Sequence, residues 1–138
     1  MSVFVDTSAW YAAADVDDAG HVRAARRLEE FAGALVTSDH VIVETWFLAT
    51  RRLGIAVAER LVNGIRMGIA RIEPAIVADL EAAASIGEAF ADQRFSLVDR
   101  TSWAIMQRLG IREALALDAD FSIYRFGLGR RQAFVVHS

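Results

Sequence analysis

Four acidic residues occupy positions that a parallel sheet would bring together. Asp6 and Asp118 each come directly after a short apolar run, which is typical of a strand buried on both faces. Glu44 lies in the first turns of a predicted helix, and Asp99 begins another predicted helix. Because strand ends and helix starts share one edge of a parallel α/β sheet, we expect these four carboxylates to converge.

Converging carboxylates repel one another and raise each other's pKa values unless a cation lies between them. Mg²⁺ and Mn²⁺ prefer such oxygen ligands and keep coordination positions for water and phosphate oxygens. An ion of this kind activates water and stabilises negative charge that develops on phosphorus. A simpler interpretation stays open, because Asp6, Asp99 and Asp118 are equally suited to cap helices. Glu44 is likewise suited to pair with His40, one helical turn earlier.

Composition narrows the classes of function. The 138 residues include fifteen arginines, no lysine and no cysteine. A P-loop lysine, a Schiff-base lysine, a thiolate zinc site and a disulfide are therefore excluded. No apolar run approaches the ~20 residues of a membrane span, and the sequence shows no basic leader with a cleavage site. The absence of cysteine fits a cytoplasmic location, which we therefore expect. The net charge of −3 is not that of a general nucleic-acid binder, although guanidinium groups suit local phosphate contacts.

The elements that must position the acids follow from the hydrophobic pattern. Short apolar runs predict five strands, at about residues 3–5, 34–36, 70–74, 114–117 and 134–136. Helical spacing predicts a short helix that ends near residue 14, and helices at about 21–32, 40–53, 57–67 and 75–91, with a last one that ends at residue 109. In the 40–53 helix we expect an apolar stripe of Val41, Val43, Phe47 and Leu48. The alternation indicates a single α/β domain over residues 1–138, with three α/β/α layers around a mainly parallel sheet of about five strands.

The motifs around the acids resemble those of the PIN-domain nucleases, and specifically of the VapC toxins of bacterial toxin–antitoxin pairs. The resemblance covers nearly the whole chain and depends on the order and spacing of four segments. These are Phe4-Val5-Asp6-Thr7-Ser8, Glu44-Thr45, the segment from Phe95 to Trp103, and Leu117-Asp118-Ala119-Asp120-Phe121.

The resemblance implies roles for individual residues. The catalytic acids would be Asp6, Glu44, Asp99 and Asp118, and all but Glu44 would hold Mg²⁺ or Mn²⁺. Glu44 would orient or deprotonate the attacking water. Supporting positions beside the metal would be Thr7, Ser8, Thr101 and Asp120. The last motif departs from the family pattern, because Leu117 stands where many PIN domains carry threonine. It also leaves open whether Asp118 or Asp120 is the closer ligand, and Asp118 is favoured because it follows the predicted strand directly.

The same resemblance implies a metal-dependent endoribonuclease, the toxin of a type II module, that hydrolyses phosphodiester bonds in structured RNA such as tRNA or ribosomal RNA. A homodimer and a cognate VapB-type antitoxin that covers the site are the expected partners. Candidates for RNA contacts are Arg51, Arg52, Arg100 and His40, within a wider set of arginines that includes Arg94.

Two alternatives differ in class from a nuclease. A non-catalytic PIN-like domain that binds RNA would be expected to lose acids, and all four are present. A phosphotransfer domain also places an aspartate after its first strand, but it normally uses a lysine beside the phosphate, and this chain has none.

Overall fold

A parallel sheet of five strands forms the centre of the computed structural model, which describes residues 1–138. The spatial order of the strands is β3-β2-β1-β4-β5, and every neighbouring pair is parallel. The strands are β1 (Val3–Val5), β2 (Leu35–Ser38), β3 (Arg71–Glu73), β4 (Glu113–Leu115) and β5 (Val135–His137). The predicted sheet is therefore confirmed, and it is entirely rather than mainly parallel.

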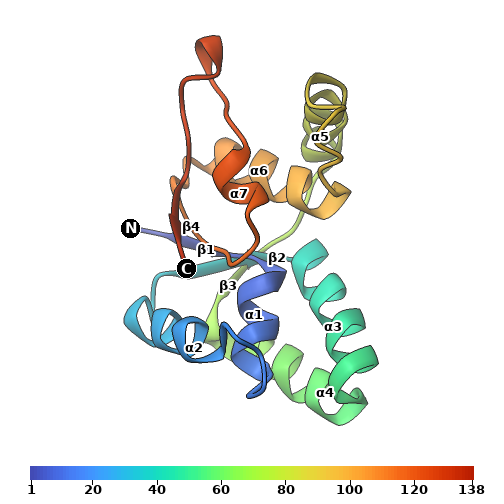
Figure 1. The fold of residues 1–138 in the computed structure, drawn as a ribbon, viewed down its shortest axis with the longest axis vertical. Coiled ribbons are helices and arrows are strands. Elements are labelled where there is room, and N and C mark those ends of the chain that lie inside the picture. The colour runs from blue at the N-terminus through green and yellow to red at the C-terminus, as the bar shows by residue number, and fades with distance from the viewer.

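Helices cover both faces of this sheet and complete the three predicted layers. In Figure 1, α1 to α4 lie on one side of the strands, and α5, α6 and α7 lie on the other. The helices are α1 (Thr7–Ala14), α2 (His21–Glu30), α3 (Asp39–Leu53), α4 (Ile55–Gly64), α5 (Val77–Ala89), α6 (Leu97–Leu109) and α7 (Asp120–Ile123). A π-helical turn, Ile65–Ile69, extends α4, and a 3₁₀ turn, Leu128–Arg130, lies in the loop before β5. No helix is long and apolar enough to cross a membrane.

The middle strand explains why the first apolar run has no polar residue. Val3, Phe4 and Val5 of β1 have no exposed surface, because β1 lies between β2 and β4 and carries a helical layer on each face. Strands buried on both faces lose the alternation of polar and apolar residues.

The order in which strands are added to the sheet changes direction beside β1. The chain moves outward from β1 through β2 to β3, then returns across the sheet to β4 on the other side of β1. The order therefore reverses between β1 and β4. In open α/β sheets, the crevice at such a reversal, beyond the carboxyl ends of the strands, is where ligands bind.

Two buried tryptophans make specific contacts, one between a helix and the sheet and one within the opposite helical layer. The indole Nε1–H of Trp10 in α1 donates to Thr37 Oγ1 at 3.2 Å, and the Thr37 hydroxyl donates to the carbonyl of Val5 at 3.0 Å. In the opposite layer, Trp103 of α6 stacks on Tyr124 with ring centroids 4.4 Å apart. The first contact holds α1 next to the ends of β1 and β2, and the second joins α6 to the end of α7.

Candidate functional site

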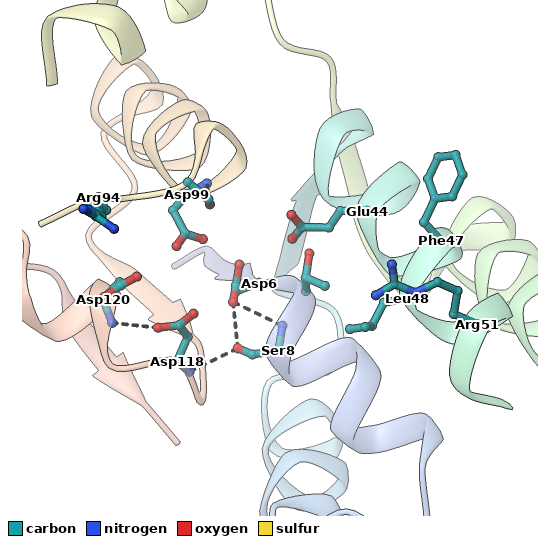
Figure 2. A pocket seen from close by; sticks show the side chains of 12 residues that line it. Asp6, Ser8, Glu44, Phe47, Leu48, Arg51, Arg94, Asp99, Asp118 and Asp120 are labelled. Carbon is teal, nitrogen blue, oxygen red and sulfur yellow. Dashed lines mark hydrogen bonds between the residues drawn. The ribbon is translucent and has the colours of Figure 1, made fainter. Parts of the chain in front are cut away.

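A pocket of about 530 Å³ opens at the carboxyl ends of β1 and β4. Figure 2 shows side chains from several elements that point into it, including the start of α1, the second turn of α3, the first turn of α6 and the β4–α7 loop. The lining residues are Asp6, Thr7, Ser8, Glu44, Phe47, Leu48, Arg51, Arg94, Ser96, Asp99, Asp118 and Asp120. The structure thus brings together all four predicted acids.

Asp6 caps α1 and also presents a free oxygen. Its side chain is almost fully buried, and its Oδ2 accepts hydrogen bonds from the backbone N–H of Ser8 at 3.1 Å and from the Ser8 hydroxyl at 2.7 Å. Its Oδ1 is buried without a hydrogen-bond partner. Burial, with a smaller contribution from the charge of Glu44, raises the pKa of Asp6 to about 6. The helix cap and a metal ligand are therefore compatible within one carboxylate.

Ser8 ties the start of α1 to the loop that carries the last acid. Its hydroxyl donates to Asp6 Oδ2 and accepts from the backbone N–H groups of Leu117 at 2.9 Å and Asp118 at 3.3 Å. A hydroxyl has one hydrogen to donate and two lone pairs to accept with, so all its bonding capacity is used. Ser8 thereby fixes the distance between the two strand ends.

Asp99 is the buried acid of the opposite layer. It lies in the first turn of α6, where its backbone N–H donates to the capping hydroxyl of Ser96 at 3.1 Å. Burial, together with the charges of the surrounding carboxylates, of which Asp6 contributes most, raises the pKa of Asp99 to about 8. Without a cation in the pocket, Asp99 therefore holds a proton at neutral pH.

Asp99, Asp118 and Asp120 form the tightest group, with one carboxylate oxygen from each within 4.8 Å of the others. The backbone N–H of Asp120 donates to Asp118 Oδ1 at 2.9 Å, which places both residues in one turn. Burial and the charge of Asp118 raise the pKa of Asp120. The reason for favouring Asp118 over Asp120 was wrong, because β4 ends at Leu115 and neither residue follows the strand directly.

The donor set fits a hard divalent cation. Asp6 and Thr7 line the pocket, and each has one buried oxygen, Oδ1 of Asp6 and Oγ1 of Thr7, that lacks any hydrogen-bond partner. Buried oxygens without partners are costly in a folded protein, so each requires a ligand or an ordered water. Together with the three grouped carboxylates they offer only oxygen ligands, the type that Mg²⁺ and Mn²⁺ prefer.

Two arginines lie on the pocket wall without an acidic partner. Arg51, in the last turn of α3, and Arg94, in the loop between α5 and α6, line the pocket, and neither forms an ion pair. Arg94 has a backbone φ of 54°, an uncommon conformation for a residue with a side chain. Their guanidinium groups are available to phosphate oxygens beside the acids.

Arg100 and Thr101 do not face the pocket, contrary to expectation. The Arg100 guanidinium donates to the carbonyls of Phe95 at 3.1 Å and Ala83 at 2.8 Å, so it joins α6 to α5. The Thr101 hydroxyl is buried and donates to the carbonyl of Leu97 at 2.7 Å within its own helix. Both polar groups donate to backbone oxygens and neither residue lines the pocket, so the roles predicted for them at the RNA and beside the metal stay predictions. His40, in the first turn of α3, is not among the lining residues either.

Part of the predicted apolar stripe of α3 is not core. Phe47 and Val43 are 61% and 54% exposed, and Phe47 lies on the pocket wall beside Leu48. The residues three and four positions after Glu44 share its helix face, so this spacing was the signal that placed them at the site. Ser96 was also missed, although the pattern Ser96-x-x-Asp99 marks a helix start.

Comparison with known proteins shows family membership over most of the chain. The model of the PIN domain family matches residues 3–127. VapC20 of Mycobacterium tuberculosis strain H37Rv, a 23S rRNA-specific endonuclease, is 40% identical over 126 residues, which are 90% of this chain and 95% of that protein. Ribonuclease VapC26 of the same strain is 29% identical over 130 residues, 93% of this chain and 96% of that protein.

Solved structures of VapC proteins have the same fold as this chain. The crystal structure of M. tuberculosis VapC20, described as a sarcin–ricin loop cleaving toxin, has a TM-score of 0.83 and 36% identity, and covers 88% of this chain and 94% of that one. DNA-bound VapBC from Salmonella typhimurium has a TM-score of 0.60 at 15% identity, with 84% of this chain and 85% of that one covered, which supports the fold alone.

Proposed function

The chain belongs to the PIN-domain family and, within it, to the VapC endoribonucleases, and we propose that it is the RNA-cleaving toxin of a type II toxin–antitoxin pair. The observation that carries the proposal is the pocket itself. Four acids from four separate segments converge there, and the buried Oδ1 of Asp6 has no partner within the protein. A structural role alone would not require an unsatisfied buried carboxylate oxygen beside other acids.

In this proposal Asp6, Asp99 and Asp118 hold Mg²⁺ or Mn²⁺, with Asp120, Thr7 and Ser8 in support. When bound, the ion supplies Lewis-acid stabilisation of the charge that develops on the scissile phosphate and lowers the pKa of a bound water. Occupation of the site requires Asp99 to release its proton, because a protonated carboxylic acid is a poor ligand.

The remaining residues act on water and on the RNA backbone. Glu44 projects from α3 toward the other acids in Figure 2, and it orients the attacking water and accepts its proton. Arg51 and Arg94 hold the phosphates on either side of the acids, since a guanidinium group binds phosphate oxygens through paired N–H donors.

The proposed substrate is a structured RNA, and 23S ribosomal RNA is the first candidate because VapC20 is named for cleaving it. Activity on ribosomal RNA implies a cytoplasmic enzyme. We also infer that residues 1–138 act as one PIN domain, that the active form is a homodimer, and that a VapB-type antitoxin covers the acidic pocket with a basic side chain.

One assay tests the catalytic proposal. Protein freed of antitoxin is incubated with ribosomal RNA and with Mg²⁺, Mn²⁺ or EDTA, and the RNA ends are mapped. Cleavage is expected only with a divalent cation. Asp6→Asn and Asp99→Asn should lose it by at least a hundredfold, while the control Asp92→Asn, an exposed residue that lines no pocket, cleaves normally. Undiminished cleavage by both pocket variants would contradict the assignment.

A further inference from the structure

A second cavity adjoins the acidic pocket. It has a volume of about 300 Å³ and shares the lining residues Ser8, Leu48 and Asp118 with the larger pocket, so the two are neighbours. Its other lining residues are Tyr11, Asp18, Arg52 and Leu117. A nucleic-acid strand with its scissile phosphate at the acids therefore has a hollow of defined shape beside it.

Arg52 forms one wall of this cavity. Its guanidinium group lies over the ring of Tyr11, with the central carbon 5.3 Å from the ring centroid. The Tyr11 ring is itself held in place, because its hydroxyl donates to Asp15 Oδ2 at 2.6 Å. Arg52 forms no ion pair, and its side chain is exposed. Tyr11 therefore lies on one side of the guanidinium group, and the exposed remainder of the group faces the cavity without an ion-pair partner.

The opposite part of the cavity is built from two loops in close contact. The loop before α2 packs directly against the β4–α7 loop, since a Cβ atom on Gly20 would meet the end of the Leu117 side chain, which would have to move. Asp18 Oδ1 accepts the backbone N–H of Gly20 at 2.8 Å, which fixes this carboxylate at the cavity. Leu117 directly precedes Asp118, so the cavity and the acidic site share a loop.

The chemistry of these walls selects the part of a nucleotide that fits. Asp18 and Asp118 both line the cavity, and two carboxylates disfavour a phosphate group. A base has a flat face that stacks on a guanidinium plane, and ribose hydroxyls donate to carboxylates. A volume of about 300 Å³ lies at the lower end of the range for small-ligand pockets, roughly 300–1,000 Å³, which suits a single nucleoside.

We propose that the cavity between Arg52, Tyr11 and Asp18 binds the nucleoside next to the scissile phosphate, with the base stacked on Arg52 and the ribose at Asp18. The inference rests on the proposed function, since it requires RNA in the neighbouring pocket. In this proposal Arg52 and Asp18 position the substrate, and a base stacks on the Arg52 guanidinium group instead of a phosphate binding to it.

The test combines variants of the protein with variants of the RNA. The probe is a synthetic sarcin–ricin hairpin, either intact or with one abasic nucleotide on the 5′ or the 3′ side of the mapped cleavage site. Binding is measured with Ca²⁺ in place of Mg²⁺, by fluorescence anisotropy, and cleavage is measured separately with Mg²⁺. The proteins are wild type, Arg52→Gln, Arg52→Lys and the control Arg60→Gln, an exposed arginine of α4 that lines neither pocket.

For wild type and Arg60→Gln, one of the two abasic positions should weaken binding about tenfold, the scale of one base stacked on a side chain. For Arg52→Gln the intact and abasic hairpins should bind equally. Arg52→Lys should resemble Arg52→Gln, because lysine keeps the charge but has no flat face.

Three results would overturn the inference. They are no effect of either abasic position on wild type, an equal abasic effect in wild type and Arg52→Gln, or full retention of the effect in Arg52→Lys. If wild type cleaved no RNA with any divalent cation, the proposed function would fall. Hairpins with the abasic nucleotide at each loop position in turn need no mapped cleavage site, and their binding to wild type and Arg52→Gln would still decide whether the cavity holds a base.

Discussion

Replacement of Asp99 by asparagine should stabilise the metal-free protein at alkaline pH while it abolishes RNA cleavage. Asp99 is 6% exposed and lies among other carboxylates, so its ionised form is unfavourable in the fold without a cation. Asparagine keeps nearly the same shape and carries no charge. Loss of function and gain of stability in one variant would separate the acid's chemical role from a role in holding the fold together.

The magnitude follows from the pKa of Asp99, which rises from 3.8 to about 8. At about 1.36 kcal/mol per pKa unit, the four-unit shift sets an upper limit of roughly 6 kcal/mol. The exposed Asp118 and the half-buried Asp120 keep water beside Asp99, which weakens the repulsion, and we expect a difference on the order of 2–4 kcal/mol.

The sign of the pH dependence is fixed by the direction of the shift. Between pH values of about 4 and 8 the folded protein keeps a proton on Asp99 that the unfolded chain has released, so the free energy of unfolding falls as the pH rises. Asp6, with a pKa raised to about 6, adds a smaller loss between about 4 and 6. The Asp99→Asn variant should therefore match wild type near pH 4 and exceed it above pH 8.

Urea unfolding followed by tryptophan fluorescence, with EDTA present, measures this difference at pH 4.5 and at pH 8.5. Asp92→Asn, an exposed residue outside every pocket, is the matched control and should not differ from wild type. Added Mn²⁺ should stabilise wild type at pH 8.5 and have little effect on Asp99→Asn. The reasoning is refuted if Asp99→Asn is less stable than wild type at pH 8.5, or if wild-type stability does not fall between the two pH values.

Three further substitutions test individual contacts. Ser8→Ala removes the hydroxyl that joins Asp6 to the β4–α7 loop, and should lower the free energy of unfolding in urea by roughly 1–3 kcal/mol. It should also lower kcat/KM about tenfold, and an unchanged kcat/KM would exclude a positioning role for Ser8. Gly87→Ala places a Cβ against the Arg100 guanidinium and displaces it from the Ala83 carbonyl, and alanine's advantage over glycine within a helix, roughly 0.5–1 kcal/mol, offsets part of the cost. The variant should therefore lose about 1 kcal/mol of stability and keep normal cleavage per folded molecule, whereas lost cleavage at full stability would return Arg100 to the RNA site. Glu44→Gln should lower kcat by at least about a hundredfold, with little change in KM or in the free energy of unfolding. A rise in KM alone would instead assign Glu44 to substrate binding.

The order of elements and the convergence of the acids were predictable because they depend on local patterns. Apolar runs and helical spacing identified the strands and the main helices, although several ends differ by two or three residues, such as β4, which ends at Leu115 instead of Leu117. Once the sheet is parallel, the residues after β1 and at the start of α6 must lie at one edge. Asp6 and Asp99 therefore reached the same pocket from opposite helical layers.

Side-chain orientation was less predictable, because a periodic pattern gives the angle between residues on a helix and not the partner that each face meets. Arg100 was expected at the RNA and instead bonds to backbone carbonyls of α5 and its own loop, whereas Phe47 was expected in the core and instead lies on the pocket wall. Arg51 and Arg52 are neighbours in sequence, yet only Arg51 lines the acidic pocket, while Arg52 lies over Tyr11 in the adjoining cavity.

The sequence by itself determined which acids are present, their order along the chain and the parallel sheet that gathers them, since these follow from residue type and short-range periodicity. Only the tertiary structure decided how far each acid is buried away from water. Asp6 and Asp99 are buried and their pKa values are raised, whereas Asp118 is exposed at the rim. The physical reason is that desolvation depends on the packing of residues far apart in sequence. The free oxygen of Asp6 arises in the same way, because Ser8 satisfies one side of its carboxylate and the surrounding fold excludes water from the other.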